Sequence, residues 1–165
     1  LKDLRGIGYQ TGCGCMVGSP YQTAEHLAED LLFTRAFRPQ MVGIGPFLPH
    51  KDTPFCREKP GTLRDTLMML SLTRLMNPSV LLPATTALGT LTPGGREQGI
   101  LAGANVIMPN ISPPQVRGSY LLYDNKIGVG DDEVSSRDRV VQAVRAIGYE
   151  IVVGRGDYQE EKIHD

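Results

Sequence analysis

The chain has 165 residues, and its 17 Lys and Arg against 18 Asp and Glu leave a formal net charge of -1. This balance gives no global attraction to nucleic acid or to an anionic membrane surface. With 41% hydrophobic and 21% charged residues the composition is that of a globular protein, and no apolar run reaches the roughly 20 residues that span a bilayer. We therefore expect one soluble domain with neither a nucleic-acid nor a membrane partner.

Cys13, Cys15 and Cys56 are an odd set of cysteines with no secretory signal before them. This favours a reducing compartment over a disulfide scaffold, and we expect a cytoplasmic protein. In a strand Cys13 and Cys15 would share one face; a metal pair is conceivable, but buried, unreactive thiols are the better interpretation. Cys56 and His50 could form half of a zinc site, but two ligands are too few, so no metal site is predicted.

The hydrophobic pattern alternates between short apolar runs, typical of strands buried on both faces, and longer segments with helical periodicity. Thr23, Thr62 and Ser135 are placed to cap three of these helices. The first four elements predicted in chain order are a strand over 12–18, a helix over 24–37, a strand over 41–47 and a helix over 63–76. They are followed by a strand over 80–86, a helix over 96–102, a strand over 105–109, a helix from 135 ended by Gly148, and a short strand over 149–153.

Repeated strand-helix units produce either an open doubly wound sheet or part of a barrel, and periodicity does not decide between them. A complete eightfold barrel takes about 250 residues. A barrel would therefore require about half of the structure to lie outside this chain. The chain also opens at Leu1 without an initiator Met, which we interpret as a partial chain.

Five segments together resemble a known family: residues 12–18, 41–54, 83–90, 93–97 and 103–110. They are similar, in one order over roughly residues 1–150, to the C-terminal half of the HydE family of [FeFe]-hydrogenase maturases, which are radical S-adenosylmethionine enzymes related to biotin synthase. The resemblance implies an α/β fold, the C-terminal half of a (βα)8 TIM-type barrel with parallel strands and outer helices. That incomplete barrel would occupy residues 1–153, and 154–165 would be a mobile tail.

The resemblance also implies a cofactor and a reaction. The absent N-terminal half would carry a Cys-x-x-x-Cys-x-x-Cys loop that binds one [4Fe-4S] cluster, whose open iron binds S-adenosylmethionine. The resulting 5'-deoxyadenosyl radical would act on a small cysteine-bound iron carbonyl cyanide precursor of the diiron subsite. The implied partners are the chain's own N-terminal half-barrel, other hydrogenase maturation proteins and this organometallic substrate. The protein would position the reactants and exclude water.

Site residues follow from the positions that match the family motifs. Those that resemble apolar contacts to the cofactor are Met16, Met41 and Leu48. Those that resemble substrate or anion contacts are the cavity-floor residues Thr85 and Thr86 and the wall residues Met108 and Tyr120. Those that resemble the residues nearest the reacting centre, and are our catalytic candidates, are Leu122 and Tyr123.

Two departures from the family pattern limit what the chain can do. It has no Cys-x-x-x-Cys-x-x-Cys, so by itself it should lack the cluster and be inactive. Some members carry an auxiliary cluster in the region aligned with 128–139, where this chain has no cysteine, and no auxiliary cluster is expected. The acidic residue common at the end of the Gly14-x-Met16-x-Gly18 motif is replaced by Tyr21.

Several residues have a structural interpretation beside the functional one. Thr85 and Thr86 could satisfy backbone groups at a strand end, Met108 could fill a core, and Tyr120 and Tyr123 could pack over an open barrel end. The sequence Gly-Gly-Arg at 94–96 could bind an anion at a helix start or form a tight turn. Two other functions also remain: another biotin-synthase-like radical enzyme, and an isolated small-anion-binding module.

Overall fold

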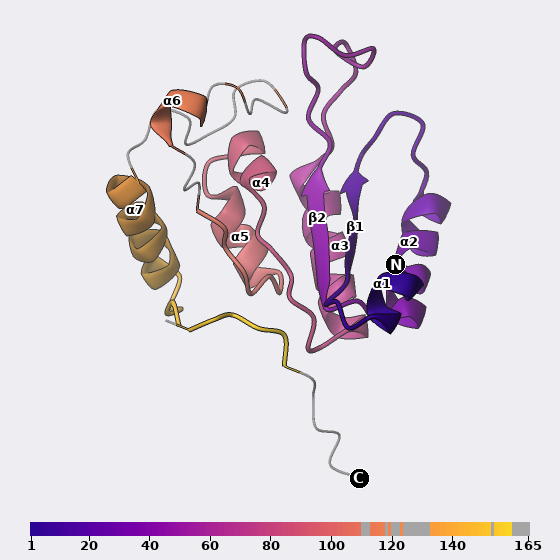
Figure 1. Cartoon of the computed structure of the whole chain (residues 1–165). Coiled ribbons are helices and arrows are strands. Elements are labelled where there is room, and N and C mark those ends of the chain that lie inside the picture. Colours follow the sequence, from indigo (N-terminus) through magenta and orange to yellow (C-terminus); the bar gives the residue numbers. More distant parts are fainter. Residues whose placement is uncertain (110–112, 118, 120–122, 124–132, 153, 160–165) are drawn as a thin grey trace.

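The computed structural model describes residues 1–109, 113–117, 119, 123, 133–152 and 154–159 (Figure 1). The elements in chain order are α1 (Lys2–Gly6), β1 (Gly12–Val17), α2 (Ala24–Phe37), β2 (Met41–Pro46), α3 (Leu63–Met76), α4 (Thr86–Leu91), α5 (Gly95–Leu101), α6 (Pro114–Arg117) and α7 (Glu133–Ala146). None of these described helices is long and apolar enough to cross a membrane.

β1 and β2 form a parallel two-stranded sheet in which Gly12 lies opposite Met41. Two single parallel bridges continue the sheet, from Met41 to Leu81 and from Pro83 to Val106. Four successive segments therefore lie side by side in sequence order and run in one direction. The predicted α/β class with parallel strand pairing is confirmed at this level.

The third and fourth predicted strands are reduced to these bridges, and the reason lies in two residues. Pro83 has no N–H to donate to a ladder. The Asn105 side chain accepts the N–H of Leu82 at 2.8 Å, where a backbone carbonyl would otherwise accept it. The two segments therefore pair through only a few backbone hydrogen bonds. In one of them the N–H of Ala84 donates to the Val106 carbonyl at 2.8 Å.

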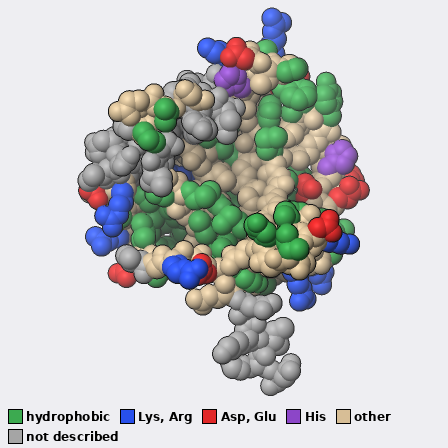
Figure 2. Space-filling view, in the orientation of Figure 1, with side chains coloured by type: hydrophobic (Ala, Val, Ile, Leu, Met, Phe, Trp, Pro, Cys, Tyr) green, Lys and Arg blue, Asp and Glu red, His purple; other side chains and the backbone are tan. Residues whose placement is uncertain are grey.

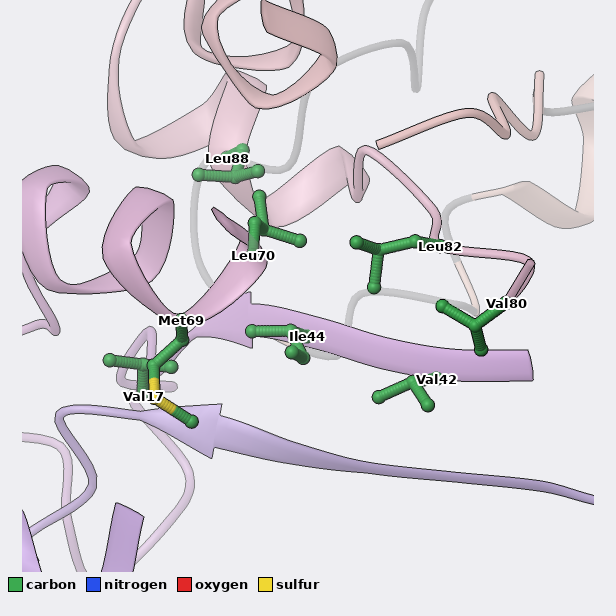
Figure 3. Packing of buried hydrophobic residues seen from close by; sticks show 8 residues of the cluster. All are labelled: Val17, Val42, Ile44, Met69, Leu70, Val80, Leu82 and Leu88. Carbon is green, nitrogen blue, oxygen red and sulfur yellow. The ribbon is translucent and has the colours of Figure 1, made fainter. Parts of the chain in front are cut away.

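One face of the sheet packs against the helices. Val17, Val42 and Ile44 point from the strands toward α2 and α3, and all three are at most 2% exposed. Figure 3 shows these side chains with those of the surrounding elements, which are Met69, Leu70, Val80, Leu82 and Leu88. A second cluster joins α5 and α7 through Ile100, Val140 and Val144. Helical and strand periodicities thus bury their apolar side chains in two clusters.

Local capping explains why α2 and α3, two of the three 14-residue helices, match their predicted ranges. Thr62 accepts the N–H of Asp65 at 3.1 Å, which satisfies one of the free donors in the first turn of α3. In α2 the Nδ1 atom of His26 accepts the N–H of Thr23 at 3.2 Å. His26 is exposed, and its side chain thus caps its own helix.

α1 was not predicted, because five residues show no readable periodicity and form no helix alone. Tertiary contacts of Arg5 hold it in place. The guanidinium donates to the carbonyls of Phe37 and Arg38 at 2.7 and 2.9 Å and lies 4.0 Å from the centre of the Phe37 ring. Its charge therefore sits at the negative C-terminal end of α2.

Three further element predictions are wrong. α4 begins at Thr86, which was predicted as the end of a strand, and continues over residues 87–91, for which no element was predicted. α7 begins at Glu133, so Ser135 lies inside the helix and is not its cap. Residues 149–152 form no strand and are exposed, because no described strand lies beside them to pair with. Gly148, with φ of +84°, does end the helical segment as predicted. The predicted tail lies partly outside the described residues.

Candidate functional site

The second face of the sheet is lined by glycine. Because side chains alternate along a strand, residues opposite to the buried set share this surface, which we call the glycine-lined face. It consists of Gly12, Gly14 and Met16 of β1 and Met41, Gly43 and Gly45 of β2. In Figure 2 most charged side chains lie around the rim of the molecule, and the centre is backbone and uncharged side chains. A flat group could approach the backbone closely here.

Thr85 stands at the C-terminal end of this face. A Cβ built on Gly45 would lie 2.8 Å from the Thr85 Oγ1 atom, so the hydroxyl fills the space that the glycine leaves. Among the described residues this buried Oγ1 atom has no hydrogen-bond partner. A buried hydroxyl without a partner costs free energy, which a polar ligand group could offset. Thr86 follows as the first residue of α4 and is half-buried.

The three residues predicted to contact the cofactor do not all lie at the same end of the sheet. Met16 is 59% exposed and lies opposite Gly45, near Thr85. Met41 lies opposite Gly12, four residues back along the sheet, which at about 3.3 Å per residue is about 13 Å away. Leu48 follows β2 and is half-buried. The structure therefore brings Met16 to the Thr85 end and places Met41 at the opposite end of the strands.

The remaining predicted site residues lie beyond the paired strands. Met108 is 57% exposed and follows the Val106 bridge, so it does not fill the core. The Tyr123 side chain hydrogen-bonds Thr90, and burial raises the pKa of its phenol, against smaller opposing effects of Thr90 and Arg96. It is thus tied to α4 and α5. Tyr120 and Leu122 lie outside the described residues.

The Gly-Gly-Arg segment before α5 is explained by backbone packing. A Cβ on Gly95 would lie 2.2 Å from the Leu88 carbonyl oxygen, so only glycine fits there. Its N–H already donates to the Thr92 carbonyl at 2.9 Å. Gly94 adopts φ of +73°, which also favours glycine. Of the two interpretations, these contacts support the tight turn.

Cys13 and Cys15 lie on the helix-facing side of β1, away from the glycine-lined face. With Asp30, Thr34 and other side chains they line a cavity of about 110 Å³ between β1, α2 and α3. Burial, helped by the nearby Asp30 carboxylate, which accepts a hydrogen bond from the thiol, raises the pKa of Cys15 to about 12. Burial also raises the pKa of Cys13. Both groups should stay protonated thiols at neutral pH.

We therefore predict selective alkylation of Cys56, which is exposed in the loop after β2. A thiol with a pKa of about 12 is a thiolate in roughly one molecule in ten thousand at pH 8. Iodoacetamide at pH 8 should label Cys56 first, and labelling of Cys15 should rise about tenfold for each pH unit up to pH 10. Mass spectrometry of peptides measures this, with the chain in guanidinium as the fully reactive control. Equal rates at Cys15 and Cys56 in the folded chain would contradict the burial of Cys15.

Among the described residues no group of three His, Cys, Asp or Glu side chains could hold a metal ion. His50 and Cys56 lie in the loop between β2 and α3, where the His50 Nδ1 atom accepts the N–H of Asp52 at 3.1 Å. Phe55 packs edge to face on Phe47 in the same loop. These contacts give the loop a local structure without any ion.

Gln22, which contacts the end of β1 through its side chain, was missed in the sequence. The Gly-x-Gly-Pro segment that contains Gly45 resembles a motif that lets backbone approach the cofactor closely, and in the structure Gly45 makes room for Thr85. Gln22 had no signal, because a polar residue after a turn is ordinary.

The fold and this site define an α/β protein with parallel strands. Its glycine-lined face ends at a buried hydroxyl that has no hydrogen-bond partner in the described part of the chain. The chain is 47% identical over 148 residues to the "[FeFe] hydrogenase maturase subunit HydE" of Thermotoga maritima, a match that takes in 90% of this chain and 42% of that protein. The chain is thus a homologue of HydE, and the resemblance inferred from its motifs is confirmed. It spans less than half the length of this relative. No protein-family model matches the chain.

Proposed function

We propose that these residues form the C-terminal part of a radical S-adenosylmethionine enzyme that acts in [FeFe]-hydrogenase maturation. The support is the similarity to HydE over 90% of the chain. The chain spans 42% of that relative, so the activity is proposed for a parent enzyme that also contains the cluster-binding half. Its proposed partners are that half-barrel, the other maturation proteins and a small cysteine-bound iron carbonyl cyanide complex.

The proposed half-barrel is supported by the order of the parallel segments. A doubly wound sheet reverses its strand order and carries helices on both faces. Here β1, β2 and the segments at Leu81 and Val106 follow one another without reversal. Leu27 and Leu31 of α2 and Met69 of α3 pack on the same side of the sheet. A barrel places its helices outside in this manner and leaves the other face for the interior.

The residues present fit the implied cofactor. When bound beside a reduced cluster, S-adenosylmethionine supplies a 5'-deoxyadenosyl radical. The chain's own contribution is binding and orientation. Gly43 and Gly45 expose backbone on the glycine-lined face, and Met16 adds an exposed apolar side chain. The Thr85 hydroxyl can donate to a cyanide, carbonyl or carboxylate group of a substrate. Tyr123 is held at α4 by its bond to Thr90.

One observation carries this proposal: the Thr85 Oγ1 atom is buried against Gly45 and has no partner among the described residues. Thr73 offers a matched comparison. It is 1% exposed and its hydroxyl is also unpartnered within the described part of the chain, but it lines the cavity on the helix-facing side of the sheet. A ligand at the glycine-lined face would contact Thr85 and not Thr73.

The test uses the parent enzyme, reconstituted without oxygen, and 5'-deoxyadenosine as the product. Thr85→Val, which keeps the shape and removes the hydroxyl, should weaken binding of a cysteine-bound iron dicarbonyl cyanide complex about tenfold, because one buried hydrogen bond is lost. Thr85→Ser should restore most of it, and Thr73→Val should leave it unchanged. Absence of 5'-deoxyadenosine from a parent with an intact cluster would count against the proposed activity.

The same hydroxyl could instead serve an isolated module that binds small anions without radical chemistry. Calorimetric titration of this chain alone with thiocyanate separates the two functions. Saturable binding that Thr85→Val abolishes would support the module. A parent enzyme that forms 5'-deoxyadenosine and turns over a substrate other than an iron complex would support another biotin-synthase-like activity.

A further inference from the structure

Gln22 contacts the C-terminal end of β1 with both ends of its side-chain amide. The N–H of Gly18 donates to the Gln22 Oε1 atom at 2.7 Å, and the Gln22 Nε2 atom donates to the Met16 carbonyl at 2.9 Å. The backbone N–H of Gln22 donates to the Ser19 carbonyl at 3.0 Å, which closes the turn between strand and amide. Gln22 is thus fixed by three hydrogen bonds, two from its side chain and one from its backbone.

These bonds lie on the edge of β1 that faces away from β2. The Val17 carbonyl accepts the N–H of Phe47 at 2.8 Å and so points toward the β2 side. Carbonyls of successive residues in a strand point to opposite edges, so the Met16 carbonyl points to the other edge. The Gly18 N–H is trans to the Val17 carbonyl in their shared peptide group and therefore points to that edge as well. No described strand pairs with β1 there.

The pattern of the two bonds is that of a parallel strand. In a parallel ladder one residue donates its N–H to a carbonyl of the neighbouring strand, and its own carbonyl accepts from the N–H two residues further along that strand. The Gln22 amide does the same with Met16 and Gly18. The Gln22 amide occupies the place of a neighbouring strand at Met16 and Gly18. A strand that pairs with the earlier part of this edge of β1 would therefore have to end before Met16.

We propose that Gln22 is a positioning residue that completes the open edge of β1 and so fixes Met16 and Gly18 beside the ligand. The inference rests on the proposed function and deepens it, since the ligand that Met16 would contact is the adenosyl part of S-adenosylmethionine. Gln22 itself lies on the strand edge and acts through the backbone that it holds.

The local backbone needs such a support. Gly18 has φ of +80° and Tyr21 has φ of +66°, and the second value is unfavourable for a residue with a side chain. The Tyr21 side chain is 86% exposed, and Met16 is 59% exposed. Packing therefore does little to hold either residue. The Gln22 amide spans the turn with its two bonds, and the Ser19 hydroxyl adds a longer bond to the Met16 carbonyl at 3.5 Å.

Gln40 supplies a matched control at the other end of the same strand. Its Oε1 atom accepts the N–H and the hydroxyl of Thr11 at 2.8 and 3.1 Å. Gln40→Ala should therefore destabilise the start of β1 without moving Met16. Gln22→Ala and Gln40→Ala remove the same side chain and two hydrogen bonds each, so they separate positioning from general stability.

The experiment measures the dissociation constant of S-adenosylmethionine for the cluster-loaded parent enzyme, without reductant so that no turnover occurs. Gln22→Ala should raise this constant about tenfold, the effect of one to two lost hydrogen bonds. Gln22→Glu keeps the acceptor for Gly18 and loses the donor to Met16, and should raise it two- to threefold. Gln40→Ala should leave it unchanged. Hydrogen exchange at the Gly18 amide should accelerate only in the Gln22 variants.

An unchanged constant in Gln22→Ala, or an equal rise in Gln40→Ala, would overturn the positioning role while the proposed function stands. If Gln22→Ala does not fold, Gln22→Glu decides, and binding as tight as in the unsubstituted enzyme overturns the role. Failure of the unsubstituted parent to bind S-adenosylmethionine with its cluster intact would instead remove the proposed function, and this inference with it.

Discussion

Gly14→Ala is expected to lower the free energy of unfolding of this chain by about 3–5 kcal/mol, among the largest effects of a single substitution. A Cβ on Gly14 would lie 2.0 Å from the carbonyl oxygen of Gly43 and 2.8 Å from its carbonyl carbon. Both atoms belong to the backbone of β2, so no side chain can rotate away. The strands would have to separate at the centre of their six-residue ladder, which would break hydrogen bonds and expose the core beneath.

Gly43→Ala is the matched control because Gly14 and Gly43 are paired across the ladder. A Cβ on Gly43 would meet nothing closer than the Cys13 carbonyl oxygen at 4.0 Å. We expect its free energy of unfolding to stay within about 1 kcal/mol of the unsubstituted chain. Urea unfolding followed by circular dichroism measures both values. A loss in Gly14→Ala as small as that in Gly43→Ala would contradict the close approach of Gly14 to the Gly43 backbone.

The long helices and the first two strands could be predicted because each has several independent signals. α2 and α3 combine 14 residues of helical pattern with Thr at the start, and their bounds were predicted to the residue. β1 and β2 are short apolar runs interrupted by glycine, and their predicted ends differ from the structure by one residue. Local sequence and tertiary packing agree in these segments.

The short elements could not be predicted, because contacts distant in the chain decide them. α1 depends on Arg5 reaching the end of α2, 32 residues away. The predicted strand over 80–86 depends on whether its N–H groups find partners, and the Asn105 side chain takes one of them. Neither contact is visible in a window of ten residues. The exposed run at 149–152 has strand composition, but no described strand lies beside it.

In the site, too, the sequence predicted which residues take part, but not where the structure places all of them. The motifs identified Thr85 and Met16, and the structure places both at one end of the glycine-lined face. They also selected Met41, which lies at the other end of that face. A motif fixes a residue's identity and its strand, whereas its distance from the ligand depends on register. The bridging amide of Gln22 depends on the turn geometry and was not predicted.

Leu70→Ala is expected to lower the free energy of unfolding by about 2–5 kcal/mol. The side chain is 0% exposed at the centre of the core cluster, between β2 and the later helices (Figure 3). The side chains of Leu70, Leu88 and Ala84 surround the Cβ position of Gly99, so Leu70 joins α3 to α4 and α5. Removing it leaves a cavity that this close-packed region can only partly fill.

The same substitution should loosen the segment that holds Thr85, because α4 rests on Leu70 through Leu88. Hydrogen exchange at the Leu88 amide, which donates to the Thr85 carbonyl at 3.2 Å, should accelerate in Leu70→Ala. Leu75→Ala on the same helix is the control: its side chain is 76% exposed, and the expected loss is at most about 0.5 kcal/mol with unchanged exchange. Equal losses at positions 70 and 75 would mean that α3 does not present Leu70 to the core, and that Thr85 is held in place by other contacts.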